Sequence, residues 1–150
     1  MLREFNGTTA VVVKHNNPCG IGTGENITEA FVKARECDPL SAFGGIIALN
    51  DEVTGTLAEE ITSAFYEVVI APKFSEESKK ILSKKKNLRL LEMPDVLNEA
   101  KHGLQTRLIY GGLLAQEDDS AMQDESTWKV ATDRSPTPEE RHALSFAWKV

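Results

Sequence analysis

The sequence predicts an α/β fold of three layers, in which helices cover both faces of a mostly parallel sheet. Two observations predict it: short apolar, β-branched segments alternate with longer segments of helical periodicity, and clusters of glycine, proline and asparagine separate them. The chain has 150 residues, of which 41% are hydrophobic and 27% are charged, as is typical of one globular domain.

The first segment, residues 8–13, is β-branched and apolar and predicts a buried strand. Residues 14–24 are rich in asparagine and glycine and predict a loop. A helix is expected to begin at Ile27, because Asn26 is a suitable N-cap and Glu29 stands in the capping-box position. This helix should end near Cys37, before a proline.

The middle of the chain predicts two more pairs of strand and helix. Residues 46–49 and 68–71 have the composition of short strands, and between them Leu57, Ile61, Ala64 and Phe65 follow one face of a helix. From Ser75 a further helix is expected, with glutamates in its first turn and lysines 84–86 in its last. The basic run is therefore interpreted as a helix terminus rather than a nucleic-acid patch.

The last third contains three apolar segments with strand character: residues 88–93, residues 108–115, which Gly111 and Gly112 interrupt, and residues 128–132. Thr137, Pro138 and Glu140 then predict the start of a helix, as N-cap, first-turn proline and capping-box residue. That helix carries Leu144, Ala147 and Trp148 and stops at Val150 without a capping residue. We therefore expect the chain to be part of a longer protein.

Charge and composition exclude several classes of protein. A net charge of -6 argues against a nucleic acid as the main partner, although a small pocket for one phosphate stays open. No apolar run approaches the roughly 20 residues of a membrane helix, and no signal-peptide core is present, so a cytoplasmic protein without a membrane partner is expected. The two cysteines, Cys19 and Cys37, are interpreted as reduced thiols.

Lys14 and His15 are the first candidates for chemistry, because they follow a buried strand, and ligands of open α/β sheets bind beyond the carboxyl ends of strands. Both side chains can reach one site only if the strand breaks there, as the following Asn-Asn-Pro indicates. A histidine can accept a proton near neutral pH, and an adjacent ammonium can stabilise negative charge. The alternative is a solvated lysine beside a histidine that bonds its own backbone.

Two other segments only partly match known nucleotide-binding and zinc-binding motifs. The glycine-rich segment 20–24 lacks both the final glycine of the dinucleotide pattern and the Gly-Lys-Ser/Thr of a phosphate loop. Cys19 follows a proline as in zinc deaminases, but Gly22 stands where the second cysteine is needed, so no metal site is predicted. His102 and His142 have no nearby ligand partners and are expected to be ordinary surface or core histidines.

Phe43, Gly44 and Glu67 are weaker candidates. Phe43 is either a core residue or a lid over a flat ring, and Gly44 either forms a turn or lets a ligand approach backbone amides. Glu67 precedes the strand at 68–71, where a carboxylate can accept a hydrogen bond from a substrate amino group or simply end a helix. Spacing alone does not decide between these roles.

Several ordered motifs resemble the transformylase domain of the bifunctional purine biosynthesis protein. They are Lys-His-Asn-Asn-Pro-Cys-Gly from Lys14, Asp-Pro-Leu-Ser-Ala-Phe-Gly-Gly from Asp38, Glu-Val-Val-Ile-Ala-Pro from Glu67, Ile-Tyr-Gly-Gly-Leu-Leu-Ala from Ile109 and Phe-Ala-Trp-Lys-Val from Phe146. The resemblance covers essentially the whole chain. It implies formyl transfer from 10-formyltetrahydrofolate to the amine of 5-aminoimidazole-4-carboxamide ribonucleotide (AICAR), in purine biosynthesis.

The same resemblance implies a cytidine-deaminase-like α/β fold without zinc, and a homodimer with active sites at the subunit interface. His15 matches the catalytic base and Lys14 the residue that stabilises the transition state, while Phe43, Gly44 and Glu67 match the nucleotide-binding region. Residues 1–150 resemble the N-terminal lobe of the domain, so the chain alone is expected to be inactive. Two rival hypotheses remain: a non-catalytic nucleotide-binding module, and a nucleotide-binding domain of unrelated function.

Overall fold

The computed structural model describes residues 1–95, 98, 103–117 and 124–150. The chain divides into two compact units, one made of Met1–Leu97 with Lys149–Val150 and the other of Asn98–Trp148. Each unit is described by itself below.

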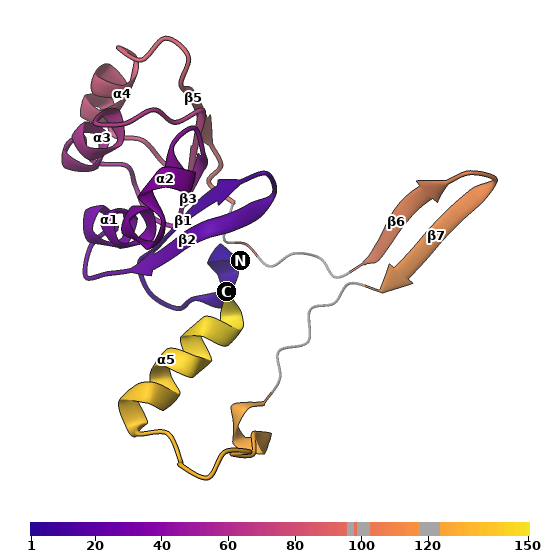
Figure 1. Cartoon of the computed structure of the whole chain (residues 1–150). Helices are drawn as coiled ribbons and strands as arrows, with labels where there is room; N and C mark the ends of the chain where they lie inside the picture. Colours follow the sequence, from indigo (N-terminus) through magenta and orange to yellow (C-terminus); the bar gives the residue numbers. More distant parts are fainter. Residues whose placement is uncertain (96–97, 99–102, 118–123) are drawn as a thin grey trace. The chain divides into compact units, whose positions relative to one another are not determined.

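The first unit contains a five-stranded sheet and its helices (Figure 1). In chain order its elements are η1 (Leu2–Glu4), β1 (Thr9–Lys14), β2 (Asn17–Thr23), α1 (Ile27–Cys37), α2 (Pro39–Ala42), β3 (Ile46–Leu49), α3 (Gly55–Thr62), β4 (Val68–Ala71), α4 (Glu76–Leu82) and β5 (Arg89–Glu92). The strands lie in the order β2-β1-β3-β4-β5. The α/β class expected from the sequence is therefore confirmed.

The sheet is mixed, whereas the sequence predicted a mostly parallel one. β1 is antiparallel to both β2 and β3, and only the pairs β3–β4 and β4–β5 are parallel. The difference arises at β2, which occupies most of the segment predicted as a loop. A Cβ atom at Gly20 would lie 1.9 Å from the carbonyl oxygen of Ala34, and one at Gly22 would lie 2.3 Å from that of Ala30. These glycines let a strand press against α1.

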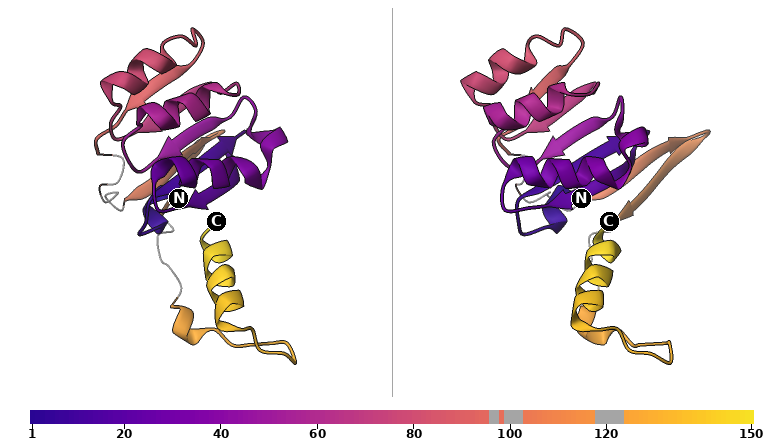
Figure 2. Two further views of the ribbon diagram at one scale, coloured as in Figure 1. Left: turned by 90° about the vertical axis from the view of Figure 1, so that its left-hand side faces the viewer. Right: turned by 60° about the vertical axis from the view of Figure 1, so that its left-hand side comes forward.

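The helices α1, α3 and α4 lie on one side of the sheet (Figure 2). The core between them is formed by alternate strand residues, among them Val12, Ile47 and Val69, and by the apolar faces of the helices. On the other face of the sheet, Ile46 of β3 is 37% exposed and Leu91 of β5 is 46% exposed. Among residues 1–95, the α-helices therefore do not form the second helical layer that the sequence predicted.

The helix boundaries follow local capping. Asn26 accepts a hydrogen bond from the amide of Glu29 at 3.0 Å, so the predicted N-cap of α1 is confirmed. The Glu29 carboxylate accepts from the amide of Glu25 at 2.8 Å, one residue before the N-cap. α3 ends at Thr62, earlier than its apolar pattern suggested, and this leaves Phe65 beyond the helix.

In the second unit, β6 (Leu104–Ile109) and β7 (Gly112–Glu117) form an antiparallel hairpin, so the strand predicted at 108–115 is in fact a turn with parts of two strands. Gly111 permits the turn with φ +78°. η2 (Glu125–Thr127) and α5 (Pro138–Lys149) follow. The strand predicted at 128–132 is wrong, because these residues have no strand pairing.

The start of α5 agrees with the prediction. The Glu140 amide donates to the Thr137 hydroxyl at 3.2 Å, and the Thr137 amide donates to the Glu140 carboxylate at 2.8 Å, which is a complete capping box. His142 lies exposed on α5, whereas His102 is outside the described residues. None of the helices in the described ranges is long and apolar enough to cross a membrane.

Candidate functional site

The turn between β1 and β2 presents Lys14 and His15. His15 and Asn16 both have left-handed backbone conformations, with φ +54° and +65°, and Lys14 pairs with Asn17 across the hairpin. Positive φ at two successive residues matches the right-handed twist of the strands, although it is unusual without glycine. The Asn17 side-chain amide donates to the His15 carbonyl at 3.3 Å and closes the turn. The strand thus breaks where the sequence analysis required.

Lys14 reaches from β1 to the segment between α2 and β3. Its ammonium group donates a hydrogen bond to the carbonyl oxygen of Phe43 at 2.5 Å. Gly44 follows with φ +73°, and a Cβ atom there would lie 3.8 Å from the Lys14 Nζ atom. The structure therefore brings three of the predicted site residues, Lys14, Phe43 and Gly44, into one cluster. Two of the three ammonium protons remain for a ligand.

Glu67 directly precedes β4. Its amide donates to the carbonyl of Gly45 at 3.1 Å, and its own carbonyl accepts from the amide of Arg89 at 3.0 Å, so its backbone is fixed between β3 and β5. The carboxylate is exposed and has no hydrogen-bond or ion-pair partner within the described ranges. The same holds for the imidazole of His15. Both groups are available to a ligand.

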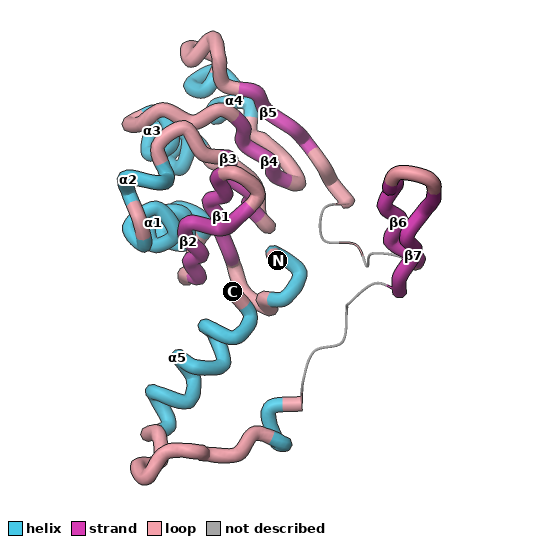
Figure 3. The backbone as a smooth tube through the Cα atoms, turned by 45° about the vertical axis from the view of Figure 1, so that its right-hand side comes forward, coloured by secondary structure: helices cyan, strands magenta, loops and turns pink. Residues whose placement is uncertain are grey.

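The segments that carry the five predicted residues meet at one end of the sheet, where β1 ends and where β3 and β4 begin (Figure 3). Lys14 ends β1, and because β1 runs antiparallel to β3, this end lies beside the amino ends of β3 and β4, where Gly44 and Glu67 stand. The sequence predicted a site beyond the carboxyl ends of parallel strands. In the structure, the site lies at the end of the sheet where the carboxyl end of β1 meets the amino ends of β3 and β4. This arrangement results from the antiparallel pairing of β1 with β3.

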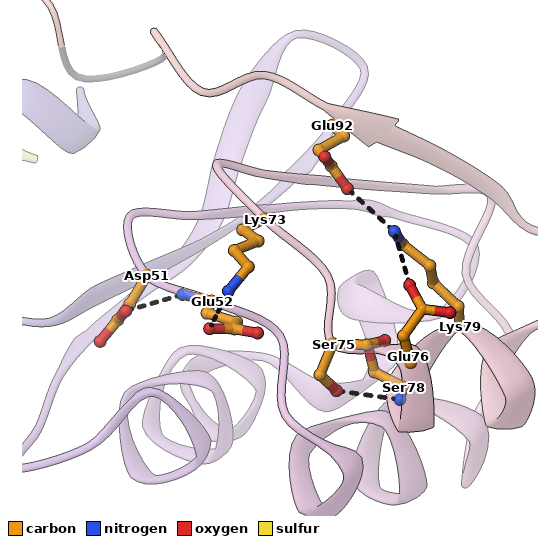
Figure 4. Close-up of polar contacts among 8 residues, drawn as sticks. All are labelled: Asp51, Glu52, Lys73, Ser75, Glu76, Ser78, Lys79 and Glu92. Atoms are coloured by element: carbon orange, nitrogen blue, oxygen red, sulfur yellow. Dashed lines mark hydrogen bonds and ion pairs between the residues drawn. The ribbon is translucent and has the colours of Figure 1, made fainter.

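At the opposite end of the sheet, near the carboxyl ends of β3, β4 and β5, charged side chains form ion pairs (Figure 4). Lys73 binds Glu52 at 3.1 Å, and Lys79 binds Glu76 at 3.4 Å and Glu92 at 3.5 Å. The hydrogen bond that Lys79 donates to Glu76, with the negative charge of Glu92, raises the pKa of Lys79. These side chains are paired with one another, whereas the Glu67 carboxylate at the opposite end of the sheet has no partner within the described ranges.

A pocket of about 440 Å³ adjoins the Phe43–Gly44 segment. Phe43, Phe65 and Tyr66 form one part of its wall, with the rings of Phe43 and Phe65 5.5 Å apart and tilted by 49°. Residues 84–88 form another part, and the three lysines there have no ion-pair partner in the part of the chain that the structure describes. α4 ends at Leu82, so the lysines follow the helix rather than form its last turn.

Phe65 and the lysines at 84–86 are not among the site residues predicted from the sequence. Phe65 matched the apolar face of a helix, and the lysine run had a sufficient explanation as a helix terminus. The available signal was a run of three lysines in a chain of net charge -6. Only the tertiary structure shows that this run and the two phenylalanines line the same pocket.

The remaining candidates for chemistry are thiols. Cys19 donates to the carbonyl of Val12 at 3.4 Å, and burial raises the pKa of its thiol. Cys37 is exposed at the end of α1, and both cysteines are free. Within the described ranges no three His, Cys, Asp or Glu side chains gather in a way that could hold a metal ion.

Comparison with known proteins gives a match over the whole chain. Residues 1–150 match the family described as the AICARFT/IMPCHase bienzyme. The bifunctional purine biosynthesis protein PurH of Enterococcus faecalis is 49% identical over 146 residues, which are 97% of this chain and 28% of that protein. PurH of Listeria monocytogenes is 50% identical over 147 residues, 98% of this chain and 28% of that protein. The chain thus spans less than a third of the length of these relatives.

Among solved structures, RibD of Acinetobacter baumannii has a TM-score of 0.50 and 18% identity, covering 60% of this chain and 29% of that one. This likeness concerns the fold alone. It agrees with the α/β arrangement of sheet and helices described above.

Proposed function

Since this chain belongs to the AICARFT/IMPCHase bienzyme family, we propose that it forms the N-terminal lobe of a transformylase domain and takes part in formyl transfer in purine biosynthesis. The observation that carries the proposal is the cluster at the β1–β2 turn. Lys14 donates a hydrogen bond to the Phe43 carbonyl, and His15, whose imidazole has no partner within the described ranges, follows it in the turn. The proposed reaction moves a formyl group from 10-formyltetrahydrofolate to the 5-amino group of AICAR.

His15 is proposed as the general base. The amine of AICAR is attached to an electron-poor ring, so its lone pair is delocalised and attacks a formamide carbonyl poorly unless a proton is removed as the bond forms. In this step the amine nitrogen bonds to the formyl carbon and its proton passes to the imidazole. The tetrahedral intermediate then collapses, the bond from the formyl carbon to the folate nitrogen breaks, and that nitrogen takes up a proton.

Lys14 is proposed to stabilise the oxyanion of that intermediate or to protonate the departing nitrogen. The hydrogen bond to the Phe43 carbonyl holds its ammonium group in place before the substrate arrives. A donor that is fixed in advance needs no reorganisation during the reaction, which makes it more effective.

Glu67 and Gly44 are proposed to hold the ribonucleotide. The free carboxylate of Glu67 can accept hydrogen bonds from an amino or hydroxyl group, and Gly44 presents its backbone without a side chain. The adjoining pocket suits the folate, because the rings of Phe43 and Phe65 offer an aromatic surface and the lysines at 84–86 offer cations for its carboxylates. No metal takes part in this proposal.

The proposed setting is a cytoplasmic homodimer with further chain outside this lobe. Half of the site would then come from elsewhere, and the isolated chain should show no formyl transfer, because proximity accelerates a reaction only when both reactants are held in one site. The alternative is a nucleotide-binding module that has no catalytic role even in its full context.

The test uses a chimera in which this chain replaces the matching segment of the Enterococcus faecalis relative. We expect formyl transfer by the folded chimera and a loss of kcat of roughly 10²- to 10⁴-fold in His15→Ala, with little change in ribonucleotide affinity. Asn6→Ala, which alters an exposed residue away from the β1–β2 turn, is the control. A folded chimera without activity, or a His15→Ala variant with normal kcat, would contradict the proposal.

A further inference from the structure

Phe65 has an environment that core packing does not explain. Phe65 is 41% exposed and lies beyond the end of α3 at Thr62. The next residue, Tyr66, is 3% exposed and packs edge-on against Phe31. Tyr66 thus makes the core contact at this position in the chain. The ring of Phe65 has other neighbours.

These neighbours are Phe43, whose carbonyl accepts the hydrogen bond of Lys14, and Gly44, which follows it. The ring of Phe65 lies 5.5 Å from that of Phe43, and its edge would be 3.7 Å from a Cβ atom at Gly44. The carbonyl of Phe65 also accepts a hydrogen bond from the amide of Gly44 at 2.8 Å. The side chain and the backbone of Phe65 therefore both contact the Phe43–Gly44 turn.

The Phe43–Gly44 turn determines where the carbonyl oxygen that accepts the Lys14 hydrogen bond lies. The peptide unit between Phe43 and Gly44 contains the carbonyl that binds Nζ, and its orientation depends on the left-handed φ of Gly44. A glycine has wide conformational freedom, so its own backbone does not hold this orientation. The contact with the Phe65 ring and the hydrogen bond that the Gly44 amide donates to the Phe65 carbonyl restrict it.

We propose that Phe65 is a positioning residue that fixes the Phe43–Gly44 turn and, through it, the Lys14 ammonium group. Its catalytic consequence depends on the proposed function, whereas its effect on Lys14 does not. Phe65 also lines the adjoining pocket, so an effect through Lys14 has to be separated from an effect through direct ligand contact.

The first arm of the test is independent of activity and uses the chain itself. NMR measures the coupling across the hydrogen bond between Lys14 Nζ and the Phe43 carbonyl carbon. We expect the coupling to disappear in Phe65→Ala and Phe65→Leu and to persist in Phe65→Tyr, which keeps the ring. Leu91→Ala, which removes an apolar side chain of similar exposure from β5, is the matched control and should keep the coupling. Thermal denaturation identifies any variant that has lost its fold.

The second arm measures kinetics in the chimera. Phe65→Ala should lower kcat roughly 10- to 100-fold, since a small displacement of a catalytic group is enough for such a loss, and the ribonucleotide KM should change little. In a Lys14→Ala background, Phe65→Ala should cause no further loss of kcat. Phe65→Tyr should restore the rate.

The two arms distinguish the hypotheses. If a folded Phe65→Leu chain keeps the Lys14–Phe43 coupling, the positioning role is wrong whatever the enzyme does. If the losses from Phe65→Ala and Lys14→Ala multiply, Phe65 acts on a ligand directly and the proposal is also wrong. An inactive chimera whose NMR behaviour matches the expectation contradicts the proposed function alone.

Discussion

Gly44 has a backbone conformation, φ +73°, that L-amino acids other than glycine adopt at a cost of roughly 1 to 2 kcal/mol. Space is not the constraint, because a Cβ atom there would make ordinary contacts of 3.7 Å with Phe65 and 3.8 Å with Lys14. The requirement for glycine therefore comes from the turn that orients the Phe43 carbonyl.

We expect Gly44→Ala to destabilise the chain by about 1 kcal/mol and to weaken the Lys14–Phe43 hydrogen bond, because the turn shifts to relieve φ. Denaturant unfolding and the same NMR coupling measure the two effects. Gly111→Ala is the matched control, with φ +78° in open space. It should show a comparable backbone cost within its hairpin while the Lys14 coupling stays intact, and equal loss of the coupling in both variants would contradict this explanation.

The ionisation of Asp38 makes the stability of α2, the helix before Phe43, depend on pH. Its carboxylate accepts a hydrogen bond from the Ser41 amide at 2.9 Å, at the N-cap of the short helix α2 that leads to Phe43. Hydrogen bonds from the hydroxyl and amide of Ser41 lower its pKa below the usual value of 3.8. The ionised cap therefore stabilises α2 fully above pH 3.8, and this contribution is lost as the pH falls through the lower pKa of the folded state.

The corresponding prediction concerns Asp38→Asn, which keeps a capping oxygen but does not titrate. The Ser41 amide signal of the natural chain should shift with a midpoint below pH 3.8, and that shift should be absent in the variant. A midpoint at or above pH 3.8 in the natural chain would show that the capping hydrogen bonds do not stabilise the carboxylate.

At the scale of elements, β2 shows how glycine can indicate a strand rather than a loop. Gly22 lies against α1 so closely that a Cβ atom would be 2.3 Å from the Ala30 carbonyl oxygen and 2.6 Å from the Ala34 amide nitrogen. Because both neighbours are backbone atoms of a helix, no side-chain rotation relieves the clash.

We therefore expect Gly22→Ala to lower the free energy of unfolding by about 1 to 3 kcal/mol, the usual cost of forcing extra atoms into a packed interior. Urea denaturation measures this loss. Gly7→Ala serves as control, since a Cβ atom at Gly7 meets nothing within 4 Å. A Gly22→Ala chain as stable as Gly7→Ala would mean that β2 does not press on α1 in solution.

α5 depends on its capping box, because its apolar residues, among them Leu144 and Trp148, are 56% and 61% exposed and supply little packing within the described residues. Thr137→Ala should therefore cost about 0.5 to 2 kcal/mol of local helix stability. Hydrogen exchange of the amides in the first turn measures it. Thr137→Ser, which keeps the hydroxyl, should retain protection, and equal exchange in the two variants would contradict the role of the cap.

For the whole molecule, exposed apolar side chains on the sheet of the first unit, such as Ile46 and Leu91, suggest self-association. Exposed apolar surface favours contact with another protein surface, and the proposed homodimer makes a second copy the expected partner. Sedimentation should show concentration-dependent association of the chain, weakened in Leu91→Lys. Leu40→Lys, at an 87% exposed position on α2, is the control. A strict monomer at all accessible concentrations would overturn the prediction.

The sequence by itself determined the α/β class, the start of α1 at Ile27, the start of α5 at Pro138 and the positions of β3, β4 and β5. These features depend on neighbours within a few residues, namely capping side chains and the periodicity of apolar residues. The motif at Lys14 and His15 and the resemblance to the transformylase family were likewise visible in the chain alone, although the roles of these residues stay predictions.

Only the tertiary structure decided that the glycine-rich segment forms β2, that β1 runs antiparallel to β3, and that Phe65 leaves the core to contact the Phe43–Gly44 turn. These features depend on contacts with other segments of the chain. β2 packs against the Ala30 and Ala34 carbonyls, β1 pairs with β3, and Phe65 contacts the Phe43–Gly44 turn. The sequence around a glycine does not distinguish a loop from a strand packed on a helix, and the sequence around a phenylalanine does not distinguish a core position from a contact with a turn. Packing between elements decides between these environments, because the atoms that surround a residue belong to other segments of the chain.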